Sequence, residues 1–249
     1  MLRRRGDERS LPLLMLIPNL VTITGLCAGL TAIRFIMVER FDIAAMLIIF
    51  AAAIDGLDGL IARRLNAQSN FGAELDSLSD FLNFGVAPGL LVYQYALAGT
   101  YSTNWVFVLV YTLCGCLRLA RFNVNRDQPL PPGTKPHFTG VPAPGGALLA
   151  LLPLFVALLG LVDVSAFPLA YGIYLALVGL LMTSRIPTFS PKTLRIPRDK
   201  AIFVLIGTVF VLGLLVTRFW LLIVLAGLGY LVITVISVAT YLRHWRKPT

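Results

Sequence analysis

The chain has 249 residues, of which 57% are hydrophobic and 13% are charged, whereas a soluble domain carries about a quarter charged residues. Its 21 basic residues outnumber its 12 acidic ones, for a net charge of +9, but they fall in short loops between apolar runs, which favours anionic lipid over nucleic acid as the partner. The composition therefore excludes an ordinary soluble domain and predicts an all-α integral membrane protein.

A helix that crosses the bilayer needs about 20 mostly apolar residues. The first apolar run continues to Met37 without a small-residue cleavage site, so we interpret it as a retained span rather than a signal peptide. On this scale the sequence predicts a helical bundle of about eight transmembrane spans, at residues 15–37, 42–62, 77–99, 104–122, 143–162, 165–183, 201–217 and 220–242.

The basic residues are distributed unevenly between the loops. If the N-terminus is cytoplasmic, all but three of the 21 basic residues fall in segments on the cytoplasmic side, the exceptions being Arg34, Arg40 and Arg218. Cytoplasmic loops are enriched in lysine and arginine, so this pattern predicts that both termini are cytoplasmic. Together with the compact size and the lack of targeting features, it leads us to expect a bacterial cytoplasmic membrane.

Five of the twelve acidic residues lie between Asp55 and Asp80, in the segment DGLDGLIARRLNAQSNFGAELDSLSD. A carboxylate within a membrane costs about 3 kcal/mol unless it is paired or bound to a cation. Asp55 and Asp58 are three residues apart and Asp76 and Asp80 four apart, so each pair shares one face of a helix. Helices joined by a short loop pack antiparallel, and we therefore expect the four carboxylates to come together.

Such a group of carboxylates favours hard cations over zinc, and it can hold two ions of the kind that serve phosphoryl chemistry. Gly59, Ala62 and Gly72 leave room for a ligand beside the backbone, and Arg63 can neutralise a phosphate. A cytoplasmic loop with solvated charges would explain one or two aspartates, but it explains two facing pairs poorly.

The segment follows the pattern D-x2-D-G-x2-A-R-x8-G-x3-D-x3-D, which resembles the signature of the CDP-alcohol phosphotransferases. All fixed positions match, namely Asp55, Asp58, Gly59, Ala62, Arg63, Gly72, Asp76 and Asp80. The resemblance covers roughly residues 12–183. It implies a six-span core, to which we assign residues 1–183, followed by a basic loop and two further spans in residues 184–249.

The resemblance also implies a homodimer that transfers a phosphatidyl group from a CDP-linked lipid to an alcohol and releases CMP, with the active site on the cytoplasmic side. Two divalent ions, Mg²⁺ or Mn²⁺, would be held by Asp55, Asp58 and Asp76, with Asp80 near the second ion. Asp80 would also be the general base. The residues implied in binding the CDP-lipid are Pro18, Asn19, Leu20, Val21, Gly59, Ala62, Arg63, Ser69 and Gly72.

Four further segments resemble the phosphatidylserine synthase branch of that family. They are FLNFGVAPGLL after Asp80, RLARFNV from Arg118, FTGVPAP from Phe138 and PTFSPK from Pro187. The departure is Asn83, where that branch usually has serine. The resemblance implies CDP-diacylglycerol as the donor and L-serine as the acceptor.

Serine carries a carboxylate that basic residues can recognise. Arg118 and Arg121 lie one helical turn apart and could bind it, and Asn123 could add a hydrogen bond. Anchoring at the membrane edge is the alternative role of the two arginines.

The signature does not name the acceptor, so an enzyme that uses glycerol 3-phosphate, inositol phosphate or choline is an alternative. From another class, a divalent-cation transporter could use four aspartates as its transport site. Transport sites lie near the bilayer midplane, whereas these aspartates lie at span ends and beside Arg63, which disfavours that hypothesis.

Overall fold

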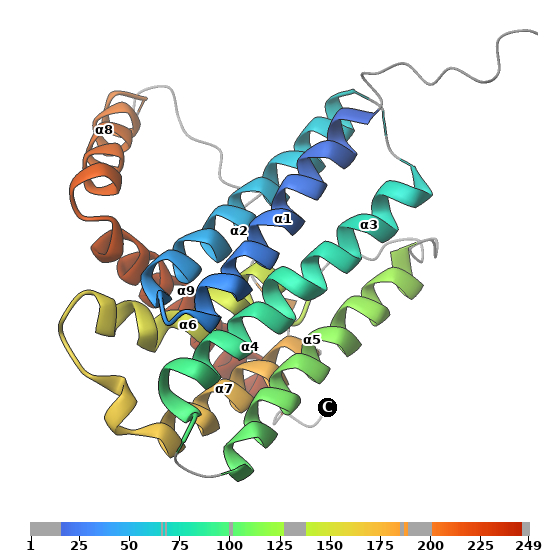
Figure 1. Cartoon of the computed structure of the whole chain (residues 1–249). Helices are drawn as coiled ribbons and strands as arrows, with labels where there is room; N and C mark the ends of the chain where they lie inside the picture. Colours follow the sequence, from blue (N-terminus) through green and yellow to red (C-terminus); the bar gives the residue numbers. More distant parts are fainter. Residues whose placement is uncertain are drawn as a thin grey trace, which may run out of the picture. The chain divides into compact units, whose positions relative to one another are not determined.

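The computed structural model describes residues 16–65, 67, 69–99, 102–126, 138–184, 187–188 and 201–245. The regular secondary structure of the described residues is helical apart from one short strand pair (Figure 1). The basic N-terminal residues and most of the two long loops that were assigned to the cytoplasmic side lie outside the described residues.

The α-helices follow the predicted spans closely. They are α1 (Ile17–Met37), α2 (Phe41–Arg64), α3 (Asn70–Asp80), α4 (Ala87–Val92), α5 (Trp105–Arg126), α6 (Ala143–Leu158), α7 (Pro168–Thr183), α8 (Ala201–Thr217) and α9 (Phe219–Trp245). Four of them, α1, α2, α5 and α9, contain stretches long and apolar enough to cross a membrane, and α6, α7 and part of α8 are shorter apolar helices. The prediction of a helical membrane protein is therefore confirmed.

The third predicted span, 77–99, differs most from the structure. Its helix begins at Asn70, because Ser69 caps the N-terminus by accepting a hydrogen bond of 3.0 Å from the amide of Gly72. Two π-helical segments, Phe81–Val86 and Tyr93–Leu97, then flank α4. Apolar composition reveals neither the polar first turns of α3 nor the π-helical turns that follow, so the sequence predicted one uninterrupted span over residues 77–99.

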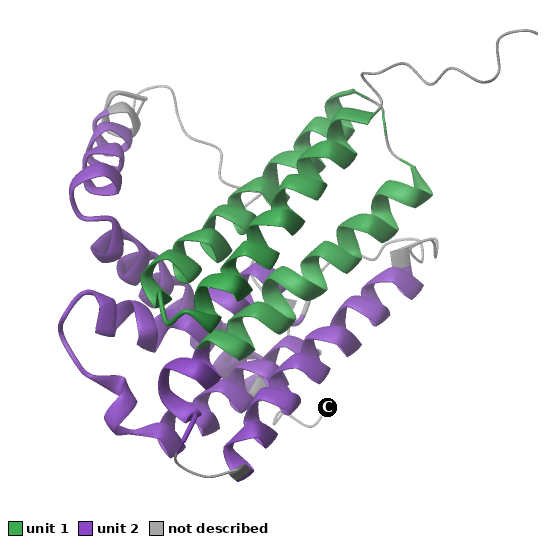
Figure 2. Ribbon diagram, in the orientation of Figure 1, with its two compact units in different colours: residues 1–91 green, residues 92–249 purple. Residues whose placement is uncertain are grey.

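The described residues form two compact units, residues 1–91 and 92–249 (Figure 2). In the first unit, α1 packs against α2 and α3. A tight turn connects α1 to α2, with Glu39 at a φ of 57° and its amide bonded to the carbonyl of Ile36 at 3.1 Å. The buried faces of α1 and α2 consist largely of small residues, namely Gly25, Ala28, Gly29, Ala32, Ala44, Ala45 and Ala51. Small residues let membrane helices approach closely.

In the second unit, α5 packs on α7, and α6 packs on both α7 and α9. Strands β1 (Phe138–Thr139) and β2 (Pro187–Thr188) pair antiparallel, so two of the four segments that resemble the synthase branch meet here. Gly140 follows β1 with a φ of 82°, and a Cβ atom there would lie 2.6 Å from the carbonyl oxygen of Met182. Only glycine fits this entry into α6.

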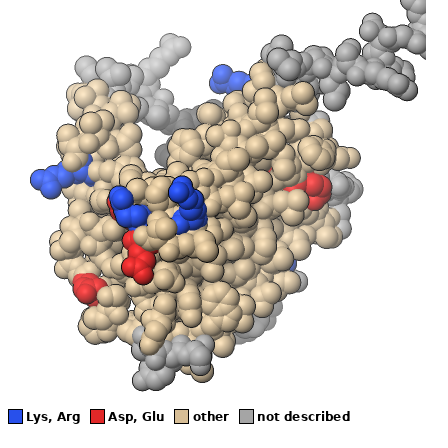
Figure 3. All heavy atoms as spheres, viewed as in Figure 1, with Lys and Arg blue, Asp and Glu red and all other residues tan. Residues whose placement is uncertain are grey.

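Large apolar side chains cover much of the exposed surface. Val216 is 84% exposed and Phe71 is 71% exposed. Charged side chains occupy only a few places on the face shown in Figure 3. Such a surface is unfavourable in water, but it suits contact with lipid chains.

Candidate metal and substrate site

The carboxylates of Asp55, Asp76 and Asp80 meet between α2 and α3 in the first unit. Each offers an oxygen, and these three oxygens all lie within 4.8 Å of one another, in half-buried positions. Asp80 is also within hydrogen-bonding reach of Asp55. The predicted convergence of the two helices is therefore present for three of the four aspartates.

Three carboxylates at this spacing repel one another. At an effective dielectric constant of about 20, two charges 4.8 Å apart oppose each other by roughly 3 kcal/mol. Carboxylate oxygens are the ligands that hard divalent cations prefer, and a cation bound among these three would relieve their repulsion, so the donor set fits such an ion.

The fourth aspartate, Asp58, is held differently. Its side chain accepts a hydrogen bond of 2.7 Å from the hydroxyl of Thr22 on α1, and both residues are nearly completely buried, at 5% and 6% exposure. The Thr22 hydroxyl also lies 3.1 Å from the carbonyl oxygen of Pro18, one turn earlier on α1. Asp58 is thus oriented by α1, and it does not belong to the group of three closely spaced carboxylates.

Sequence reasoning did not identify Thr22. The residue is 36 positions from Asp58 along the chain, and a threonine in an apolar span is usually explained by its own helix backbone. The one feature of the sequence that could have pointed to Thr22 is its position directly after the Pro18–Val21 segment, one helical turn from Pro18.

The N-terminus of α3 brings together three residues that were assigned to the CDP-lipid. Asn19 on α1 approaches Gly72 so closely that a Cβ atom on Gly72 would lie 2.6 Å from the Asn19 Oδ1 and 3.1 Å from the Ser69 Oγ. Backbone amides at a helix N-terminus attract anions, and Ser69 and Asn19 add polar groups beside them. The arrangement suits a phosphate-bearing ligand.

On α2, Arg63 is exposed and its guanidinium lies over Gly59, with 3.7 Å between Nη1 and a Cβ atom built on that glycine. Ala62, beside Arg63, is half-buried. On α1, Pro18 is buried, Val21 is half-buried and Leu20 is 57% exposed. The side chains assigned to the CDP-lipid are thus distributed over α1, α2 and the start of α3.

The residues assigned to the acceptor lie on α5 in the second unit. Arg121 donates a hydrogen bond of 2.8 Å from Nη1 to the carbonyl oxygen of Thr183, at the last residue of α7. The hydroxyl of Thr183 in turn lies 3.1 Å from the carbonyl oxygen of Cys114 on α5. Arg118 and Asn123 are both half-buried. Arg121 therefore has a structural role at the end of α7 that the sequence did not reveal.

Comparisons with known proteins find a matching family and several relatives of this chain. The family model described as CDP-alcohol phosphatidyltransferase matches residues 15–188. A protein of Mycobacterium leprae named CDP-diacylglycerol–serine O-phosphatidyltransferase is 40% identical over 244 residues, which cover 93% of this chain and 73% of the relative.

Two further relatives carry the same name. The protein of Mycobacterium tuberculosis (strain H37Rv) is 46% identical over 140 residues, covering 54% of this chain and 47% of the relative, so the match spans about half of that protein. The protein of Bacillus subtilis is 37% identical over 137 residues, covering 55% of this chain and 74% of the relative.

Proposed function

The chain belongs to the CDP-alcohol phosphatidyltransferase family, and from this premise we propose that it is a CDP-diacylglycerol–serine O-phosphatidyltransferase. It transfers the phosphatidyl group of CDP-diacylglycerol to the hydroxyl of L-serine and releases CMP. The observation that carries this proposal is the convergence of the Asp55, Asp76 and Asp80 carboxylates to within 4.8 Å. The relative from Mycobacterium leprae, matched along 93% of this chain, supports serine as the acceptor.

The reaction needs a proton acceptor beside the serine hydroxyl, because a neutral hydroxyl is a weak nucleophile. Asp80 takes this proton while the serine oxygen forms a bond to the phosphorus that carries the diacylglycerol. The bond between that phosphorus and the CMP oxygen breaks, and CMP leaves with the electron pair. The proton on Asp80 is then lost to solvent.

Asp55, Asp58, Asp76 and Asp80 would hold two divalent ions, Mg²⁺ or Mn²⁺. When bound, these ions neutralise the charge of the pyrophosphate and so stabilise the departing CMP. The half-buried carboxylates of this chain supply hard oxygen ligands, and Thr22 orients the side chain of Asp58.

The nucleotide end of the donor is bound by residues of all three helices that surround the aspartates. The N-terminus of α3, with Ser69 and Gly72, accepts a phosphate, and Arg63 adds a positive charge. The remaining residues proposed to contact the CDP-lipid are Pro18, Asn19, Leu20, Val21, Gly59 and Ala62. The close approach of Asn19 to Gly72 supports this assignment.

Arg118, Arg121 and Asn123 are proposed to recognise the acceptor. Arg121 already donates one N–H group to the Thr183 carbonyl, so it can offer only its remaining donors to a ligand. Arg118 and Asn123, which are both half-buried, are proposed to supply the other contacts to the serine carboxylate.

In the membrane, the enzyme has eight spans with both termini and the active site on the cytoplasmic side of the bacterial inner membrane. The distribution of the basic residues supports this orientation. The core comprises residues 1–183, residues 184–249 add a loop and two spans, and two copies form a homodimer.

The decisive experiment measures CMP release by the purified protein with CDP-diacylglycerol and Mg²⁺ or Mn²⁺. L-serine, glycerol 3-phosphate, inositol phosphate and choline are compared as acceptors, and chelation by EDTA tests the need for a divalent ion. We expect release with serine alone and none after chelation. Release only with another alcohol would overturn the assignment of the acceptor. Metal uptake into liposomes without CMP release would instead indicate a cation transporter.

A further inference from the structure

Asn83 is a buried polar residue of the first unit, in the π-helical segment Phe81–Val86, one turn beyond Asp80. Its side chain is only 2% exposed, and Ser79, directly before Asp80, is 4% exposed. Polar side chains are costly in a membrane span, where they commonly hydrogen-bond across helices or serve a function. Two of them beside the proposed base indicate a role at this position.

The amino group of the Asn83 side chain holds the last turn of α3. Its Nδ2 donates a hydrogen bond of 3.1 Å to the Oγ of Ser79, four residues earlier. This bond crosses the junction between α3, which ends at Asp80, and the π-helical segment that follows. The side chain of Asn83 thus connects the turn that carries Asp80 to the segment after it.

The carbonyl oxygen of the same side chain faces α1. The Asn83 Oδ1 occupies the place where a Cβ atom on Gly29 would stand, and the Nδ2 lies 3.8 Å from a Cβ atom built on Gly25. The two glycines are four residues apart, and small residues at this spacing let membrane helices approach closely. The amide of Asn83 therefore packs directly on the backbone of α1.

This contact gives the amide a fixed direction. The Asn83 Oδ1 has no conventional hydrogen-bond partner among the described residues. Contacts between a Cα–H group and a carbonyl oxygen recur at helix–helix interfaces, and Gly29 offers such a group to this oxygen. An apolar side chain could rotate or slide at this interface, whereas an amide with one end on Ser79 and the other on Gly29 fits in one orientation.

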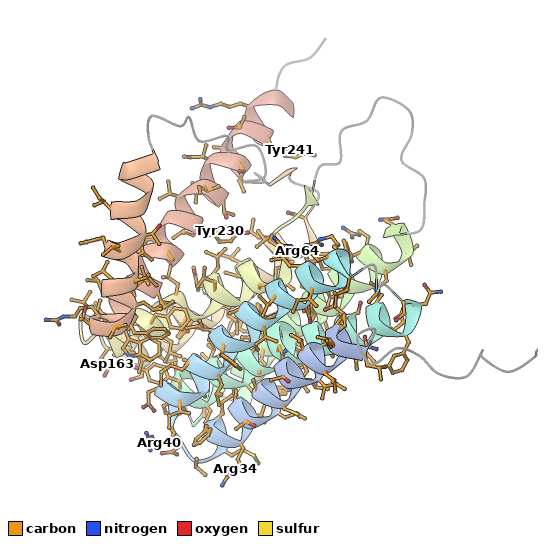
Figure 4. All side chains as sticks on the ribbon, turned by 90° about the horizontal axis from the view of Figure 1, so that it is seen from above. Arg34, Arg40, Arg64, Asp163, Tyr230 and Tyr241 are labelled. Carbon is orange, nitrogen blue, oxygen red and sulfur yellow. The ribbon has the colours of Figure 1, made fainter. Side chains whose placement is uncertain are left out.

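The same helix orients a second carboxylate of the site. Thr22 on α1 donates its hydrogen bond to Asp58, and both Thr22 and Gly29 belong to the buried residues of α1. Figure 4 shows α1 beside α2 and α3, and both helices pack against it. One helix therefore contacts both the residue that carries the Asp58 carboxylate and the segment that follows Asp80.

We propose that Asn83 is a positioning residue for Asp80. Its amide, held between Ser79 and Gly29, fixes the rotation of the last turn of α3. That rotation brings the Asp80 carboxylate to Asp55 and presents it to the serine hydroxyl. The π-helical geometry agrees with such a role, since π-helical turns are rare and lie frequently at functional sites. The inference rests on the proposed function, because it takes Asp80 as the proton acceptor.

The test is a double-mutant cycle on turnover, measured as CMP release by full-length purified proteins. Asn83→Ala should lower kcat about tenfold or more, because a displaced base acts poorly, while the KM for CDP-diacylglycerol stays unchanged. In an Asp80→Asn background the same substitution should lower kcat by less than about twofold further, since residues that act as a unit are not additive. A purely structural role of Asn83 would give the same factor in both backgrounds.

The matched control is Asn104→Ala. Asn104 is likewise a buried asparagine, 3% exposed, and its Nδ2 donates a hydrogen bond of 3.2 Å to the carbonyl oxygen of Leu97. This variant should lower the Tm without changing kcat at a temperature well below the unfolding transition. From the other side of the contact, Gly29→Ala should reproduce the loss of kcat, because its Cβ atom displaces the amide of Asn83. In the Asn83→Ala background, Gly29→Ala should add little.

The outcomes separate the inference from the proposed function. If Asn83→Ala is not recovered as folded protein, Asn83→Ser replaces it, because the related branch usually has serine at this position. An unchanged kcat, or an equal loss in the Asp80→Asn background, would overturn the positioning role and leave the proposed function standing. If turnover of Asp80→Asn is too low to measure, a raised KM for CDP-diacylglycerol in place of a lowered kcat overturns it. If the wild type releases no CMP with serine, the proposed function fails and the inference fails with it.

Discussion

Thr22 connects α1 to α2 through its hydrogen bond of 2.7 Å to Asp58, in a place where both side chains are almost fully removed from solvent. Groups that orient a metal-binding carboxylate commonly change metal affinity by about 10- to 100-fold when they are removed. The role proposed for Asp58 therefore depends on a residue outside the aspartate motif.

We expect Thr22→Val to weaken the apparent affinity for Mn²⁺ by about tenfold, because the valine keeps the volume and loses the hydroxyl. Thr22→Ser should retain the affinity of the wild type. The measurement is a Mn²⁺ titration of CMP release and of metal binding in detergent. Thr24→Val serves as the control, since Thr24 is exposed and bonds only to the backbone of its own helix at Leu20. Equal metal affinity in Thr22→Val and the wild type would contradict the orienting role.

Substitutions of Asp80 and of Asp58 should affect different steps, turnover in the first case and ligand binding in the second. Asp80→Asn is expected to lower turnover by about a hundredfold or more, the usual contribution of a general base, while CDP-diacylglycerol binding stays largely intact. Asp58→Asn should weaken metal binding and nucleotide binding together. Equilibrium binding of the CDP-lipid, measured beside turnover, separates the two. An equal loss of lipid binding in both variants would count against Asp80 as the base.

At the scale of elements, the end of α7 is held by a neighbouring helix. The last carbonyl groups of a helix lack hydrogen-bond partners within that helix. Arg121 donates a hydrogen bond to one of them, the carbonyl of Thr183, and places a positive charge at the negative end of the helix dipole. The hydroxyl of Thr183 completes the connection by reaching back to α5 at Cys114.

Arg121→Ala should therefore lower the free energy of unfolding by about 1 kcal/mol. This loss is smaller than that expected for a buried charged hydrogen bond, because Arg121 is exposed. In a protein of this size this corresponds to a fall in Tm of roughly 2–4 °C, which a thermal unfolding scan in detergent can detect. A variant with an unchanged Tm and a raised KM for serine would show instead that Arg121 acts on the acceptor.

The sequence predicted the helices well where the length of an apolar run determines them. It predicted less well those features that depend on one contact between distant residues. The spacing of Asp76 and Asp80 placed both on one face of α3, and the structure confirms that they meet Asp55. The bond between Arg121 and Thr183 joins residues 62 positions apart. On α9, Tyr230 lies against Gly145 of α6, and this contact likewise depends on how the two helices pack, which composition does not encode.

At the scale of the whole molecule, the exposed apolar side chains and the scarcity of surface charge require a lipid environment, whereas the orientation rests on the basic residues alone. We expect a cysteine at Glu39, in the turn between α1 and α2, to react with an impermeant maleimide in intact cells. A cysteine at Ala67, between α2 and α3, should react only after permeabilisation. The experiment uses a variant in which Cys27, Cys114 and Cys116 are replaced. The reverse labelling pattern would show that the protein has the opposite orientation in the membrane.

The π-helical turns of Phe81–Val86, directly after Asp80, have a consequence for how this chain can vary. In an α-helix each added or deleted residue rotates all that follows by about 100°, which would turn a buried face towards lipid. A π-helical turn closes its hydrogen bond over one residue more than an α-helical turn, so it can absorb such a change locally. Along α3, the π-helical turns and α4, insertions and deletions are therefore expected to be tolerated most easily at Phe81–Val86. The metal-binding helix before these turns and the helix after them can then change length independently.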